Sequence, residues 1–234
     1  MRISIICNHF LRWELGRVEM SIEKNINVVR QRIQGVDNRE AVNIVAATKY
    51  ADALQMGELY RSGIVKMGEN RVDAMLAKKR EIDLPIEWHF IGTLQSRKVK
   101  RVINEIDYLH SLDRLSLAME IEKHRETPLK CFIQVNVSGE ASKKGLAPDE
   151  ISPFVDELAQ YSKIEVVGLM TMAPHSEDTA MIRTCFQKLK MLQQDIQQKY
   201  TSCKELSMGM SNDYLIAIEE GATYIRLGSV LFGE

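Results

Sequence analysis

The sequence predicts an α/β fold, a single (β/α)8 barrel of the TIM type with an extra N-terminal helix. Three observations lead to this prediction. Eight short apolar runs alternate with helical patterns, no long linker separates them, and no glycine-rich dinucleotide loop follows the first run. Such alternation is typical of parallel βα units, which form either an open doubly wound sheet or a closed barrel. The number of units favours the closed barrel.

The expected elements follow in chain order. From Ser21 the apolar residues recur at helical spacing as far as Gly35, which is typical of a helix end. Strands are then expected at residues 43–48, 64–67, 87–91, 107–110, 131–137, 165–170, 204–207 and 223–227. The intervening helices are expected at residues 51–62, 71–80, 96–104, 114–125, 149–161, 178–199 and 212–220.

The first nineteen residues lack this periodicity. We therefore divide the chain into an N-terminal extension, residues 1–19, and a barrel domain, residues 20–234. The extension begins with a very short apolar run and then charged residues, which makes a poor signal peptide. We expect either a loosely attached segment or the product of an upstream start.

Composition and charge narrow the classes of function that this chain can have. The chain has 234 residues, of which 45% are hydrophobic and 27% charged, enough for one large soluble core. A net charge of −1 gives no reason to expect nucleic acid, and no segment approaches the length of a membrane span. The cysteines form no C-x-x-C pair, so we expect reduced thiols in the cytoplasm and no metal site. They are Cys7, Cys131, Cys185 and Cys203.

Lys49 is the most informative residue. It follows the apolar run at 43–48 and precedes the expected helix at 51–62, at the end of a barrel strand where active sites lie. An amine in a partly dry pocket has a lowered pKa and forms a Schiff base with an aldehyde. The alternative is a surface lysine that ends a strand, and only the other residues of the site distinguish the two.

Two loops predict a phosphate site. The loop at 207–213 contains Gly209 and offers Ser211 or Asn212 as a helix cap, and Gly228-Ser229 follows the last expected strand. Each could be an ordinary capped loop. In barrels, however, the loops after strands seven and eight often bind phosphate together.

Arg226 is expected to point into the barrel, because strand alternation directs Ile225 and Leu227 towards the helices. A buried cation needs acceptors for its hydrogen bonds, which are either a neighbouring carboxylate or a ligand atom. An amine nucleophile, a phosphate cradle and an inward arginine together indicate pyridoxal 5'-phosphate.

The chain resembles the pyridoxal-phosphate homeostasis protein family, whose fold is the alanine racemase N-terminal barrel. The matching segments appear in family order over roughly residues 20–234. They are Ala46–Tyr50, Gly68–Asn70, Trp88–Gln95, Ser111–Asp113, Gln134–Asn136, Gly168–Met172, Leu206–Ser211 and Ile225–Ser229.

The resemblance implies roles for residues of this chain. Lys49 would carry the Schiff base with pyridoxal phosphate, and Arg226 would face the pyridine nitrogen. The phosphate would be held by Ser207, Ser211, Gly228 and Ser229. Met210, Asn70 and His89 would lie near the cofactor, although His89 also fits a hydrogen-bonded core histidine and Met210 fits packing at the mouth of the barrel.

The same residues bear on whether the protein is an enzyme. An arginine only donates, so it would leave the pyridine nitrogen unprotonated and weaken the ring as an electron sink. A racemase also needs two proton-transfer groups, and the sequence offers only Lys49. Alanine racemases add a C-terminal domain, whereas here the expected strand eight lies at the end of the sequence. We therefore predict a carrier that buffers or delivers pyridoxal phosphate.

Two alternatives stay open. One is an amino-acid racemase or lyase that uses Lys49, and the other is a non-catalytic scaffold that binds partners through the basic run at 97–101. The carrier prediction makes enzymes that require pyridoxal phosphate the expected protein partners. We expect a monomer and leave a weak dimer open.

Overall fold

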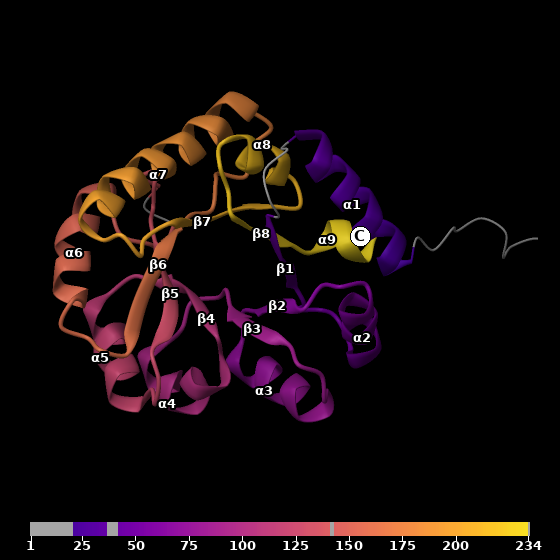
Figure 1. The fold of residues 1–234 in the computed structure, drawn as a ribbon, viewed down its shortest axis with the longest axis horizontal. Coiled ribbons are helices and arrows are strands. Elements are labelled where there is room, and N and C mark those ends of the chain that lie inside the picture. The colour runs from indigo at the N-terminus through magenta and orange to yellow at the C-terminus, as the bar shows by residue number, and fades with distance from the viewer. Residues whose placement is uncertain (1–20, 37–41, 141–142, 234) are drawn as a thin grey trace, which may run out of the picture.

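The computed structural model describes residues 21–36, 42–140 and 143–233, which form a closed barrel of parallel strands (Figure 1). Each strand pairs with the next along the chain, and β8 pairs with β1 to close the barrel. The strands are β1 (Asn43–Ala47), β2 (Lys66–Glu69), β3 (Glu87–Phe90), β4 (Tyr108–Leu112), β5 (Leu129–Gln134), β6 (Ile164–Met170), β7 (Glu205–Met210) and β8 (Tyr224–Leu227). The predicted (β/α)8 fold is confirmed.

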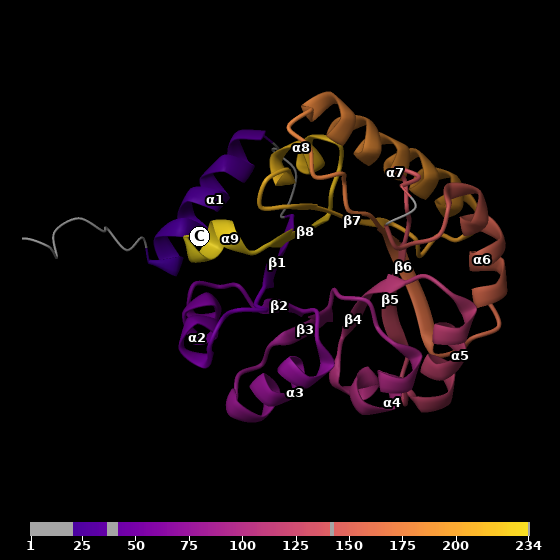
Figure 2. The same ribbon diagram turned by 180° about the vertical axis from the view of Figure 1, so that it is seen from behind.

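Helices surround the barrel, as Figure 2 shows from the other side. They are α1 (Ile22–Val36), α2 (Ala53–Arg61), α3 (Val72–Glu81), α4 (Val99–Val102), α5 (Leu115–His124), α6 (Ile151–Leu158), α7 (Thr179–Lys199), α8 (Tyr214–Glu219) and α9 (Ser229–Phe232). Short 3-10 turns lie at Ser96–Lys98, Ile103–Glu105 and Pro148–Glu150. No helix in the described ranges is both long and apolar enough to cross a membrane.

The extra N-terminal helix is confirmed. α1 lies beside α9 (Figure 1), where the Asn25 side chain donates a hydrogen bond to the carbonyl oxygen of Leu231 at 3.0 Å. Helix α9 itself has no counterpart among the predicted elements. The prediction for residues 1–19 lies outside the described residues.

Several predicted boundaries are wrong, and two of the strand ends share one cause. The strand predicted at 64–67 runs from Lys66 to Glu69, and the one predicted at 204–207 continues to Met210. Hydrophobicity locates a strand only while its side chains are apolar, whereas the hydrogen-bond ladder continues past them. Polar Glu69, for example, is still paired with Phe90 of β3. The helix predicted at 212 begins instead at Tyr214.

The interior of the barrel differs from the main core between strands and helices. Val45, Tyr108, Phe132, Val167, Met170 and Tyr224 form a separate apolar cluster there. Buried polar side chains accompany them, among them those of His89, His110, Ser207 and Arg226. Because alternate residues of each strand point inward, these groups follow from the register of the strands.

Candidate functional site

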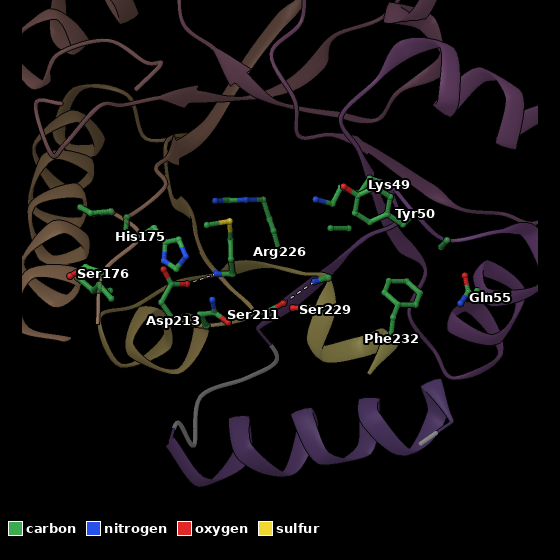
Figure 3. Close-up of a pocket in the computed structure, with 18 residues that line it drawn as sticks. Lys49, Tyr50, Gln55, His175, Ser176, Ser211, Asp213, Arg226, Ser229 and Phe232 are labelled. Atoms are coloured by element: carbon green, nitrogen blue, oxygen red, sulfur yellow. Dashed lines mark hydrogen bonds between the residues drawn. The ribbon is translucent and has the colours of Figure 1, made fainter. Parts of the chain in front are cut away.

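A cavity of about 450 Å³ opens at the carboxyl ends of β1, β6, β7 and β8 (Figure 3). This volume lies within the range of small-molecule sites. The cavity brings together six of the residues that the sequence nominated. They are Lys49, Met210, Ser211, Arg226, Gly228 and Ser229.

Lys49 lies in a tight turn between β1 and α2. The turn begins at Thr48, whose carbonyl oxygen accepts from the Ala51 N–H at 2.9 Å, and it ends at Asp52, which caps α2 together with Gln55. The Lys49 side chain is exposed, and its Nζ lies 4.5 Å from the centre of the Tyr50 ring. Lys49 lines the cavity, and its role as the amine that holds a cofactor stays a prediction.

A buried ion pair supports this turn from below. The Thr48 hydroxyl donates to Glu69 Oε1 at 2.8 Å, and Lys78 Nζ donates to the same oxygen at 2.6 Å. Lys78 also donates to the Thr48 carbonyl oxygen. The end of β1 is thereby tied to β2 and α3, so the backbone that carries Lys49 is fixed although its side chain is exposed.

Arg226 rises from β8 into the floor of the cavity and is only 5% exposed. Its Nη1 donates to Ser207 Oγ at 2.6 Å and its Nη2 to the Thr171 carbonyl oxygen at 2.9 Å. Burial lowers the pKa of Arg226 to about 10, opposed by the charge of Asp213, so the guanidinium is still a cation at neutral pH. No carboxylate of the described residues forms an ion pair with it.

The loops after β7 and β8 meet at Ser211. Its hydroxyl oxygen accepts from the N–H of Gly228 at 3.1 Å and from that of Val230 at 3.4 Å. Next to it, Asp213 Oδ1 accepts from the Met210 N–H at 2.6 Å, and burial raises the pKa of this carboxyl group. Ser211 thus ties the end of β7 to the start of α9 at one wall of the cavity.

Three nominated residues do not line the cavity. Asn70 is exposed and follows β2 directly. Its backbone packs closely on Gly92, because a Cβ added to Gly92 would lie 2.4 Å from the Asn70 carbonyl oxygen. His89 is buried inside the barrel, and the Ser207 hydroxyl lies beneath Arg226. Direct contacts of these three residues with a cofactor stay predictions.

Comparisons with known proteins identify the family of this chain. Residues 20–234 match the model of the alanine racemase N-terminal domain. The pyridoxal phosphate homeostasis protein of Aquifex aeolicus is 37% identical over 92% of this chain and 99% of its own length. That of Pseudomonas aeruginosa is 34% identical over 94% and 96%. The chain belongs to the pyridoxal phosphate homeostasis protein family.

A solved structure adds a bound ligand to the comparison. PipY of Synechococcus elongatus, determined with pyridoxal phosphate bound, is 29% identical and has a TM-score of 0.81, covering 91% of this chain and all of that one. Its structure without the ligand gives a TM-score of 0.84 at 31% identity, over 91% of this chain and again all of the other.

In this member of the homeostasis protein family, the structure also reveals residues that the sequence reasoning missed. His175 and Tyr50 line the cavity. His110 lies fully buried inside the barrel, where its Nδ1 is 2.8 Å from Ser207 Oγ. The available signals were the position of His175 soon after strand six and the two-residue alternation along β4, which places His110 inward.

Proposed function

We propose that this protein binds pyridoxal 5'-phosphate through a Schiff base on Lys49 and acts in its intracellular homeostasis, in the cytoplasm, as a carrier. The observation that supports the proposal is the single cavity that Lys49, Arg226 and the loops around Ser211 share. The names of its relatives and the ligand bound in PipY support the same cofactor.

The residues present fit this cofactor chemically. The cofactor supplies an aldehyde, a phosphate and a pyridine nitrogen. Lys49 offers the only amine that lines the cavity within the described residues. Ser211, Gly228 and Ser229 would hold the phosphate, and Met210 would cover the mouth beside them. Arg226 would donate to the ring nitrogen, with Ser207 fixing the arginine from below.

Arg226 also supports a role as a cofactor carrier rather than as an enzyme. Because the guanidinium keeps its proton at neutral pH and only donates, a pyridine nitrogen that faces it would stay unprotonated. An unprotonated ring is a weak electron sink. We therefore propose reversible binding and delivery to enzymes that need the cofactor, by a protein that is a monomer.

The first test is the absorbance spectrum of the purified protein with and without added pyridoxal phosphate. The wild type should develop a near-visible band, and borohydride reduction followed by peptide mapping should place the label on Lys49. In Lys49→Ala the band should disappear because no other amine lines the cavity in the part of the chain described. Lys188→Ala, which removes an exposed lysine of α7, should keep it.

A wild-type protein that takes up no cofactor would overturn the proposal. A label that maps to a different lysine would overturn the assignment to Lys49 alone.

One observation favours a second function, an amino-acid racemase or lyase. His175 lines the same cavity as Lys49 (Figure 3) and could supply a second proton-transfer group. Incubation with L- and D-amino acids in deuterated water measures exchange of the α-proton. Exchange that is lost in Lys49→Ala and lowered in His175→Ala would favour the enzyme, whereas no exchange with any common amino acid would exclude it.

A further inference from the structure

A chain of hydrogen bonds crosses the interior of the barrel and ends at Arg226. It begins at Glu87, the first residue of β3, whose Oε1 is 2.8 Å from His89 Nε2. His89 Nδ1 is 2.8 Å from His110 Nε2, and His110 Nδ1 is 2.8 Å from Ser207 Oγ. Ser207 Oγ in turn accepts from Arg226 at 2.6 Å. The chain therefore joins β3, β4, β7 and β8 from one end of the barrel to the floor of the cavity.

The chemistry of its two ends fixes the direction of every link. The carboxylate of Glu87 only accepts, so a neutral His89 carries its proton on Nε2 and its Nδ1 accepts from His110 Nε2. A neutral His110 therefore has an unprotonated Nδ1, which accepts from the Ser207 hydroxyl. At the other end Arg226 only donates, so the Ser207 oxygen accepts from it.

We propose that this one-way hydrogen-bond chain makes Glu87, His89 and His110 positioning residues for Arg226. Through it, Glu87 at the opposite end of the barrel orients the guanidinium that the cofactor meets. The functional part of this inference rests on the proposed binding of pyridoxal phosphate, whereas the order of the protons is a property of the protein alone.

The surroundings support this order. Reversal would require either a protonated Glu87 or a second proton on His89. The hydrogen bond from His89 lowers the pKa of Glu87, and burial lowers the pKa of His89 and of His110. The rings are also held by stacking, His89 on Tyr108 and His110 on Phe132, each with ring centres 4.5 Å apart.

The first arm of the test is nuclear magnetic resonance of the 15N-labelled protein without added cofactor. Both rings should be neutral with the proton on Nε2 at about pH 7. A coupling between the two nitrogens should cross the hydrogen bond from His110 Nε2 to His89 Nδ1. A proton on Nδ1 of either ring, or a cationic His89, would overturn the inference.

The second arm measures the affinity for pyridoxal phosphate in two variants of Glu87. Glu87→Gln keeps an acceptor oxygen for His89 and should change the affinity less than threefold, roughly the effect of a weakened hydrogen bond. Glu87→Ala removes the acceptor and should weaken binding about three- to tenfold. Glu105→Ala, which removes an exposed carboxylate paired with Lys79, is the control and should bind as the wild type does.

The two arms separate this inference from the proposed function. Glu87→Ala that binds as tightly as the wild type would overturn the positioning role. Ser207→Ala breaks the chain next to Arg226, so it should weaken binding at least as much as Glu87→Ala and serves as the second variant. A wild type that binds no cofactor would overturn the proposed function and leave the proton order to be judged by the first arm.

Discussion

Arg226 depends on two acceptors of different kinds, the Ser207 hydroxyl and the Thr171 carbonyl oxygen. Its guanidinium reaches both because its donors form a rigid fork, which a lysine ammonium lacks. At the scale of the residue, therefore, shape matters as much as charge. The backbone just after β6, a side chain of β7 and the cation of β8 are joined at this one group.

We predict that Arg226→Lys retains a cation and still lowers the free energy of unfolding by about 1–3 kcal/mol, since one of the two buried acceptors loses its donor. The affinity for pyridoxal phosphate should fall as well. Urea unfolding and absorbance titration measure the two effects. Arg226→Lys with wild-type stability and affinity would show that charge alone suffices at this position.

At the scale of the element, β6 and β7 approach each other more closely than a side chain permits. A Cβ at Gly168 would lie 1.9 Å from the carbonyl oxygen of Glu205. Glu205 is the residue of β7 that lies opposite Gly168 in the sheet. The strand that leads to Thr171 and the strand that carries Ser207 therefore meet at a position where only glycine fits.

We predict that Gly168→Ala lowers the free energy of unfolding by about 3 kcal/mol, because the two backbones must separate to admit the methyl group. Thermal or urea unfolding measures the loss. Gly35→Ala in α1 is the matched control, since no atom lies within 4 Å of its Cβ position. It should raise stability by roughly 0.5–1 kcal/mol through helix propensity. Equal effects at the two glycines would contradict the close approach of β6 and β7.

At the scale of the whole molecule, the barrel encloses two histidines that burial keeps neutral. The pKa of His89 is lowered, and that of His110 is well below its usual value. In the unfolded chain both histidine side chains would have a pKa of about 6.5. Below that pH the unfolded state binds protons that the folded state does not, so stability falls as the solution becomes more acidic.

We predict that the free energy of unfolding declines between about pH 7 and pH 5, by up to about 1.4 kcal/mol per pH unit for each buried histidine. His110→Gln should reduce this slope even though it lowers stability at every pH. Urea unfolding over the pH series measures the slopes. An unchanged slope in His110→Gln would contradict this explanation.

The sequence by itself determined the fold and the pieces of the site. Alternating apolar runs and helical patterns specify βα units, and the end of each strand places residues such as Lys49 and Gly228 at one face of the barrel, because that periodicity is local. Alternation along β8 likewise directs Arg226 inward.

Only the tertiary structure decided how those pieces are connected. The exposure of Lys49, the place of Ser207 beneath Arg226, and the path from His110 through His89 to Glu87 all depend on closing the barrel and on the register between strands distant in sequence. Hydrogen bonds between inward side chains leave no periodic trace, because each depends on which strand lies opposite rather than on its own neighbours.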